Sequence, residues 1–415
     1  MSKYSCYGPT KMPNKHTYMT LKRIVWSVLK RKVKLNVTDE AGRLPEQFIV
    51  VCNHPSAYDM FYWIAASNCV TCFTSNRYYF FNKTVGTWMR KVGCIPKNLF
   101  TVDMESVKNT LALKREGAIL GFMPEVRLSM YGEFEGLPES TAKFFKKLDL
   151  PVYLCHFDGS YLLKPKWSKK RRKGIVDVKI KLLFNRQQLK DLSADDMHAE
   201  MEKALYYNDF KWLENHPDYR YKCKKQAEGL EHILYECPHC HERFSIATKK
   251  NEVFCKECGY KVKVDDRYAF VDVNGFPHYY DNFQQWFLSL KDKLVDEIAQ
   301  NPDFKLEEEV TLFLPSSNGK GYVKKSGDGV VTFDKDGLRY GGTSEGRRVE
   351  IFIPMHDTFF LSYAMGKGFQ AFYGKEYYLF SPQNPDVSIL WYLASEQLSL
   401  AFSRRKREEK TNLQN

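Results

Sequence analysis

Hydrophobic runs and helical stretches alternate along the first half of the chain. The short apolar runs, each typical of a buried strand, lie at 48–52, 118–122, 152–157 and 176–184. Between them, the segments 106–116 and 139–148 have the apolar spacing of amphipathic helices. Strands that alternate with helices are typical of α/β proteins, so we predict an α/β domain with a largely parallel sheet and flanking helices over residues 47–215.

The pattern changes beyond this domain. Ser193 is a favourable N-cap for a helix at 194–207, and tyrosine, lysine and cysteine dominate from about 217 to 266. A helical segment at 282–298 precedes short strand-like pieces with Gly and Asp turns, and 387–402 predicts a closing helix. Strands closed by one helix suggest a small barrel of pleckstrin-homology type. We therefore expect five parts: a basic amphipathic segment (1–46), the α/β domain (47–215), a cysteine-rich module (216–268), a helical connector (269–300) and a mainly β C-terminal module (301–415).

The segment 19–35 is short, basic and amphipathic. Leu21, Ile24, Val25 and Val28 recur at helical spacing between lysines and arginines. Such a helix can lie on an anionic lipid surface, or it can pack on the neighbouring domain and leave a solvated basic edge. The sequence leaves both interpretations open.

The net charge of the chain indicates the class of its partner. The 415 residues contain 63 Lys and Arg against 50 Asp and Glu, a net charge of +13. This excess predicts an anionic partner: a nucleic acid, a phospholipid surface or a phosphorylated substrate.

The N-terminus is polar and no apolar run approaches the ~18 residues of a membrane span, so we predict a cytoplasmic protein, peripheral on the inner face of a membrane. The cysteines then lie in a reducing compartment and are candidate metal ligands before disulfides.

The most informative stretch is Asn53-His54-Pro55-Ser56-Ala57-Tyr58-Asp59, directly after the first apolar run. Pro55 disfavours a helical conformation for His54, so the histidine stays extended while a helix begins at or after the proline. Asp59 in the opening turns of that helix can then fold back onto the imidazole, whereas residues five apart on one helix lie about 140° apart. The aspartate would fix the tautomer and leave the other ring nitrogen free to take a proton. A surface histidine that caps a strand is the alternative.

A carboxylate and a guanidinium follow the second apolar run. Glu125 can orient Arg127 or accept a hydrogen bond from a substrate hydroxyl, and Arg127 offers a rigid fork of donors that suits a phosphate. A structural ion pair at a strand end is the alternative. Polar groups at the carboxyl ends of parallel strands converge on one cleft, so we expect His54 and the Glu125 region to share a site despite 71 residues of separation.

With both blocks in view, the chain resembles the glycerolipid acyltransferases, and among them the 1-acyl-sn-glycerol-3-phosphate acyltransferases that make phosphatidic acid from lysophosphatidic acid. That family carries Asn-His-x4-Asp and, after a second strand, Phe-Pro-Glu-Gly-Thr-Arg-Ser. Residues 53–59 fit the first block. Residues 122–129 keep the Phe, Pro, Glu and Ser but lack the glycine, and Arg127 comes one position early. The segment 93–97 stands where the family has its acceptor-binding block, with Lys97 in place of the usual arginine.

The resemblance covers roughly half the chain and implies an acyl transfer. It implies that His54, oriented by Asp59, removes the proton of the acceptor's free hydroxyl, and that the alkoxide attacks the thioester of acyl-CoA or acyl carrier protein. Lys97, Glu125 and Arg127 would hold the phosphate of the lysophospholipid acceptor. Catalysis would need no cofactor. Within the enzyme class, another lysolipid acceptor is the alternative.

Two Cys-x2-Cys pairs separated by 14 residues predict a metal site. The first pair is Cys237 and Cys240, and the second is Cys255 and Cys258. Four thiolates at this spacing are typical of a tetrahedral structural zinc in a zinc ribbon. Because such a site is coordinatively closed, its metal would hold the fold and do no chemistry.

The basic run 164–173 carries seven positive charges and one tryptophan. It can bind a nucleic-acid backbone or an anionic membrane, or form a solvated loop. Its place after the apolar run 152–157, near the predicted site, favours lipid headgroups or an acidic carrier protein over nucleic acid. The alternative from a different class is a basic zinc-ribbon protein that binds nucleic acid or protein and has an inactive acyltransferase-like half.

Overall fold

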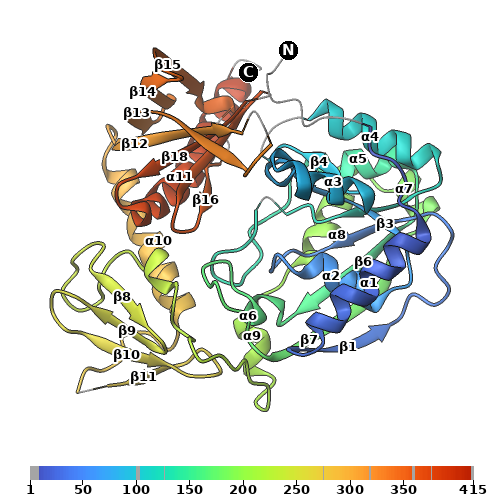
Figure 1. Cartoon of the computed structure of the whole chain (residues 1–415), viewed down its shortest axis with the longest axis horizontal. Helices are drawn as coiled ribbons and strands as arrows, with labels where there is room; N and C mark the ends of the chain where they lie inside the picture. Colours follow the sequence, from blue (N-terminus) through green and yellow to red (C-terminus); the bar gives the residue numbers. More distant parts are fainter. Residues whose placement is uncertain are drawn as a thin grey trace.

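Three modules pack around a shared interior in the computed structural model (Figure 1). The structure describes residues 9–99, 103–125, 127–273, 275–316, 319–357, 360–374 and 376–412. In Figure 1 the α/β domain lies on the right, the cysteine-rich module at lower left and the C-terminal module at upper left. One cluster of buried apolar side chains extends from Val33 to Leu398 and includes residues of all three modules. The modules are therefore packed against one another.

The α/β domain is built on a seven-stranded sheet with the order β1-β7-β6-β2-β5-β3-β4. Its strands are β1 (Val33–Asp39), β2 (Ile49–Cys52), β3 (Thr71–Asn76), β4 (Ile95–Lys97), β5 (Ile119–Phe122), β6 (Val152–Asp158) and β7 (Gly174–Phe184). Neighbouring strands are parallel except β6 and β7, which are antiparallel. All four β2 residues are buried, as expected for a central strand covered on both faces. The predicted α/β class and all four predicted strands are confirmed.

Helices cover the sheet and the connections between its strands. They are α1 (Lys15–Leu29), α2 (Asp59–Ala66), α3 (Lys83–Lys91), α4 (Met104–Arg115), α5 (Ser140–Leu148), α6 (Ser160–Leu163), α7 (Arg186–Asp191), α8 (Ala194–Leu205) and α9 (Asp209–Glu214). The predicted cap of α8 is confirmed, because the Ser193 side chain accepts a hydrogen bond from the backbone N–H of Asp196.

The N-terminal segment differs from the prediction. The amphipathic helix α1 ends at Leu29, so the stretch 19–35 is not one helix. Residues 33–39 instead form β1, which pairs in parallel with β7. The period-two alternation of Val33, Leu35 and Val37 with polar residues is the local reason for a strand. The sheet thus begins inside the segment 1–46, which we expected to lie outside the domain.

The cysteine-rich module is a four-stranded antiparallel sheet with the order β11-β10-β9-β8. Its strands are β8 (Ile246–Lys249), β9 (Glu252–Cys255), β10 (Lys261–Val264) and β11 (Phe270–Asp272). The sheet therefore extends a few residues past 268. The connector helix α10 (Phe283–Gln300) follows, and the Phe283 ring packs edge-on against Trp167 and Phe210 at centroid distances of 5.3 and 5.1 Å.

The C-terminal module is a seven-stranded antiparallel sheet closed by a helix. The elements are β12 (Leu306–Pro315), β13 (Val323–Asp334), β14 (Gly337–Ser344), β15 (Arg347–Pro354), β16 (Ser362–Ala364), β17 (Gly368–Tyr373), β18 (Glu376–Pro382) and α11 (Ser388–Asn412). Strands β15 and β16 stand at the two edges, and in the described residues they do not pair, so the sheet is open and not a closed barrel. The Trp391 ring of α11 stacks on Phe369 at 4.3 Å, and α11 also packs on α10. The mainly β fold and the closing helix are confirmed.

No helix in the described ranges is both long and apolar enough to cross a membrane.

Candidate active site and metal centre

His54 and Asp59 meet where strand β2 passes into helix α2. The His54 Nδ1 lies 3.1 Å from Asp59 Oδ2, the contact expected from the break at Pro55. Asn53 holds the end of the strand: its side-chain amide donates to the Phe157 carbonyl and accepts from the Phe157 N–H, both at 2.8 Å. These two bonds continue the β2–β6 contact one residue beyond Cys52. They therefore fix the backbone at His54 relative to the end of β6.

Asp59 is fully buried and held by three groups. Its Oδ2 also accepts from the Ser56 backbone N–H at 2.8 Å, and its Oδ1 accepts from the Ser160 hydroxyl. Burial raises the pKa of Asp59, and the bond to His54 opposes that shift. The His54 side chain is 28% exposed, and its Nε2 makes no hydrogen bond to any residue that the structure describes. The imidazole is therefore anchored on one nitrogen and open on the other.

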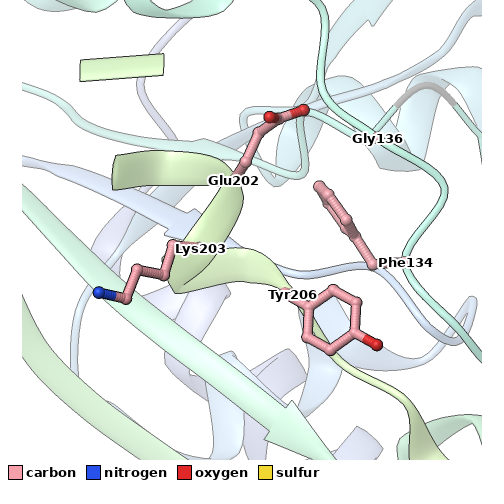
Figure 2. Close-up of a pocket in the computed structure, with 5 residues that line it drawn as sticks. All are labelled: Phe134, Gly136, Glu202, Lys203 and Tyr206. Atoms are coloured by element: carbon pink, nitrogen blue, oxygen red, sulfur yellow. The ribbon is translucent and has the colours of Figure 1, made fainter. Parts of the chain in front are cut away.

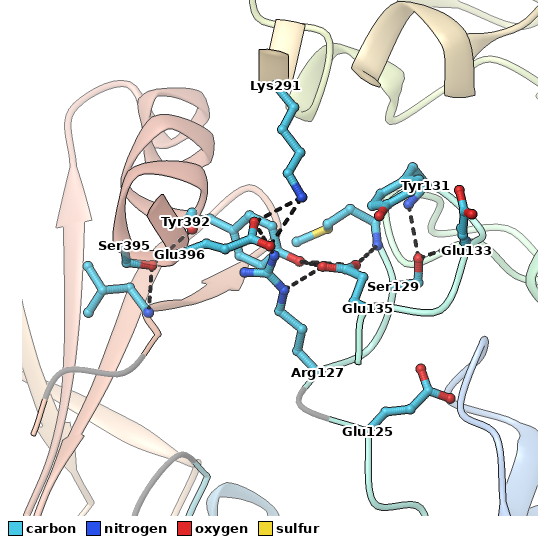
Figure 3. A network of polar contacts seen from close by, with 12 residues as sticks. Glu125, Arg127, Ser129, Tyr131, Glu133, Glu135, Lys291, Tyr392, Ser395 and Glu396 are labelled. Atoms are coloured by element: carbon cyan, nitrogen blue, oxygen red, sulfur yellow. Dashed lines mark hydrogen bonds and ion pairs between the residues drawn. The ribbon is translucent and has the colours of Figure 1, made fainter. Parts of the chain in front are cut away.

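The Glu125 carboxylate is hydrogen-bonded to the backbone of His54. One carboxylate oxygen accepts from the His54 backbone N–H, and the other accepts from the Tyr207 hydroxyl at 3.3 Å. Burial raises the pKa of Glu125 well above its ordinary value. Glu125 therefore shares the site with His54, but in Figure 3 no contact joins it to Arg127.

Arg127 points toward the C-terminal module (Figure 3). Its Nε donates to Glu135 at 2.6 Å and its Nη2 to Glu396 of α11 at 2.7 Å. The guanidinium carbon also lies 3.9 Å from the centre of the Tyr392 ring. Lys291 of α10 contacts Glu396 at 3.1 Å. Two of the three guanidinium nitrogens are thus engaged in a buried network between modules. This is a structural ion pair, the alternative to a phosphate ligand.

Lys97 lies at the far edge of the sheet. It ends β4, which is separated from β2 by β5 and β3. Three strand spacings of about 4.8 Å place it about 14 Å from the strand of His54. Its side chain is exposed, and among the described residues no hydrogen bond or ion pair joins it to Glu125 or Arg127.

An apolar cavity of about 320 Å³ lies beside the histidine loop, between α1, α2, β3 and α3. Helix α2, whose first residue is Asp59, contributes Met60, Phe61 and Ile64 to its wall. A shallow hollow of about 500 Å³ opens elsewhere on the domain and is lined by Phe134, Gly136, Glu202, Lys203 and Tyr206 (Figure 2). None of the predicted site residues lines that hollow, whereas the wall of the apolar cavity includes residues of α2 that directly follow Asp59.

The four predicted cysteines come together in the cysteine-rich module. Cys237, Cys240, Cys255 and Cys258 place their sulfur atoms within 4.8 Å of one another. The Cys237–Cys258 and Cys240–Cys255 sulfur distances are both 3.7 Å. A tetrahedron with zinc–sulfur bonds of about 2.3 Å has edges of about 3.8 Å, so the donor set and its spacing fit this metal.

Several residues of the site were not predicted. Ser160 follows the carboxyl end of β6, so the strand-end rule that led to His54 could have found it. Tyr392 and Glu396 carry no local signal, because their partner Arg127 lies far away in the sequence, 269 residues from Glu396. Glu135 lies only eight residues from Arg127, so its proximity in the sequence is a signal that could have found it.

Part of the chain is similar to known acyltransferases. Residues 34–156 match the family model described as Acyltransferase, and this stretch includes the His54–Asp59 pair. This stretch of the chain is therefore similar to acyltransferases. Among solved structures, it is similar to the 1-acyl-sn-glycerophosphate (LPA) acyltransferase PlsC from Thermotoga maritima, with 18% sequence identity and a TM-score of 0.37. That likeness covers 46% of this chain and 76% of that one. The comparison with curated proteins gives no match.

Proposed function

We propose that the chain is a glycerolipid acyltransferase that converts lysophosphatidic acid to phosphatidic acid. The acyl group would come from a thioester, either acyl-CoA or acyl carrier protein. The observation that carries the proposal is the His54–Asp59 pair, with Nδ1 bound to a buried carboxylate and Nε2 open, inside a stretch that matches an acyltransferase family. This arrangement suits a general base for a hydroxyl acceptor.

In the proposed reaction, His54 Nε2 takes the proton of the acceptor hydroxyl. The oxygen bonds to the thioester carbonyl carbon, and the tetrahedral adduct collapses with cleavage of the carbon–sulfur bond. The departing thiolate then takes the proton back from the imidazolium. Buried Asp59 holds the imidazole in one orientation and stabilises its charged form, and Glu125 holds the His54 backbone. The route needs no nucleophilic side chain and no cofactor.

The apolar cavity between α1, α2 and α3 supports a fatty acyl substrate. Its volume of about 320 Å³ lies within the usual range for ligand pockets, about 300–1,000 Å³. Most of its lining is apolar, and it begins directly after Asp59. In this proposal the acyl chain lies in the cavity and the thioester carbonyl projects toward His54.

The face formed by α1 and α3 supports attachment to an anionic membrane. Ile24, Val28 and Trp88 are each at least half exposed, and the Lys91 ammonium lies 4.7 Å from the centre of the Trp88 ring. Apolar side chains bordered by lysines are typical of interfacial helices. Trp88 also lines the cavity, so a chain could enter it from this face. Vesicle sedimentation with and without anionic lipid, beside a nucleic-acid shift assay, separates membrane binding from nucleic-acid binding.

The four cysteines would hold a structural zinc ion. Bound there, the metal supplies cross-linking of the module and no catalytic step, because four sulfur ligands leave no open position. This role rests on the sulfur distances described above.

The test is an acyl-transfer assay with the purified full chain, a panel of lysolipids and labelled acyl-CoA or acyl carrier protein. Lysophosphatidate should be acylated, and His54→Ala should lower the rate by about 10²–10⁴-fold, the usual contribution of a positioned base. His156→Ala is the matched control, because His156 lies on the neighbouring strand β6 outside the proposed chemistry. Transfer at the wild-type rate by His54→Ala would refute the proposal.

A different lysolipid acceptor is the second candidate, and the engagement of Arg127 by two carboxylates favours it. Higher kcat/KM for an acceptor without a phosphate monoester would select it. No transfer to any acceptor, together with nucleic-acid binding, would instead support the non-catalytic alternative.

A further inference from the structure

Lys166 lies where the α/β domain meets the C-terminal helix. The loop that carries it is hydrogen-bonded to the segment between His54 and Asp59, because the Ser56 hydroxyl donates to the Lys164 carbonyl at 3.2 Å. The next residue, Trp167, is buried, and its indole N–H donates to the Tyr161 hydroxyl at 3.0 Å. Lys166 is therefore a fixed part of the domain, whereas Lys169 and Lys170 of the same basic run are exposed.

Lys166 and Arg127 approach the same aromatic ring. The Lys166 ammonium lies 5.4 Å from the centre of the Tyr392 ring, and the Arg127 guanidinium carbon lies 3.9 Å from it. The two cations come from different loops of the α/β domain, and both contact the Tyr392 ring of α11. Like charges repel, so this arrangement is favourable only where anions compensate it.

Both cations have donor capacity to spare. Among the described residues, the Lys166 ammonium has no hydrogen bond or ion pair, and its contact with Tyr392 is through the ring face. Arg127 uses Nε and Nη2, whereas its buried Nη1 has no hydrogen-bond partner in the part of the chain that the structure describes. Unsatisfied buried donors are uncommon in folded proteins and often mark the place of a missing ligand.

The charge of the cluster favours an anion. Arg127, Lys166 and Lys291 carry three positive charges, and Glu135 and Glu396 carry two negative ones. Burial also raises the pKa of the nearby Glu125 carboxyl well above its ordinary value. These five side chains therefore carry about one positive charge more than their negative charges balance. The donors that remain are the Lys166 ammonium and Nη1 of Arg127.

We infer that Lys166, together with Nη1 of Arg127, binds the phosphate monoester of the acyl acceptor, and that Tyr392 of α11 forms the wall of this subsite. The inference rests on the proposed function and adds to it a specificity-determining residue that neither acyltransferase block contains. It also makes the C-terminal module part of acceptor recognition, since Tyr392 contacts both cations and Glu396 orients Arg127.

The experiment compares Lys166→Ala with Lys169→Ala, a control in the same basic run. KM and kcat are measured for lysophosphatidate and for uncharged monoacylglycerol at saturating acyl-CoA. Loss of one charge-assisted contact should raise the lysophosphatidate KM by about 10- to 100-fold in Lys166→Ala, with kcat and the monoacylglycerol KM nearly unchanged. Lys166→Arg should retain most of the affinity, and Lys169→Ala should behave as wild type. An unchanged lysophosphatidate KM, or a raised KM for acyl-CoA in its place, would overturn the inference.

Binding of glycerol 3-phosphate, measured by calorimetry on the wild-type chain and on Lys166→Ala, separates this inference from the proposed function. If the wild type acylates lysophosphatidate but Lys166→Ala leaves its KM unaltered, the function stands and the subsite is refuted. If no lysolipid is acylated but glycerol 3-phosphate binds only when Lys166 is present, the function fails and the anion subsite stands.

Discussion

Filling the apolar cavity should change the preference for acyl-chain length. Val85 of α3 lines the cavity, which has a volume of about 320 Å³. Val85→Phe adds about four carbon atoms to the wall and should exclude about four methylenes of a long chain, each contributing about 0.8 kcal/mol when buried. The loss is then about 3 kcal/mol, or roughly 200-fold in kcat/KM for a chain that fills the cavity. A chain short enough to avoid the new ring should lose little.

The assay is a competition between hexadecanoyl-CoA and dodecanoyl-CoA, read as the ratio of their kcat/KM values. Val28→Phe is the matched control, because Val28 is 54% exposed on α1 and does not line the cavity. We expect the ratio to fall by up to about 200-fold in Val85→Phe and to stay constant in Val28→Phe. If Val85→Phe has a wild-type melting temperature and an unchanged ratio, the acyl chain lies elsewhere and the reasoning fails.

Four further predictions concern the dyad, the metal and the anion subsite. Asp59→Asn keeps the shape of the buried side chain but removes its charge, so kcat should fall by about 10²-fold or more; a wild-type kcat would contradict the orienting role. Untreated protein should contain about one zinc per chain, and Cys255→Ala or chelation should lower the melting temperature in scanning calorimetry; equal melting temperatures would exclude a structural metal. Glu396 orients Arg127, so Glu396→Gln, which weakens this contact, should raise the lysophosphatidate KM, and an unchanged or lower KM would contradict the orienting role. Burial lowers the pKa of Lys166 to about 8, with Glu135 opposing and Arg127 reinforcing the shift, so the ammonium loses its charge as pH rises through this value. The lysophosphatidate KM should then rise above about pH 8 while the monoacylglycerol KM stays level; parallel curves would contradict this.

Local patterns carried most of what could be predicted. The strands at 48–52 and 152–157, the cap at Ser193 and the contact between His54 and Asp59 all depend on residues close together in the sequence. Periodicity and the conformational limits around proline act over a few residues, so they can be read without knowing what packs where. The cysteine spacing is equally local within each pair, and tetrahedral coordination supplies the rule that joins the two pairs.

The partners of Arg127 could not be predicted in this way. Its position after a strand suggested a phosphate ligand, yet its orientation depends on Glu135 and on Glu396, the latter on a helix of another module. The same holds for β1, whose place beside β7 joins segments about 140 residues apart, and for the cavity enclosed by three separate helices. A sequence specifies which residues seek burial or a charged partner, but the partner is chosen by how whole surfaces pack, because the energy of burial and ion pairing depends on the full surroundings of each group.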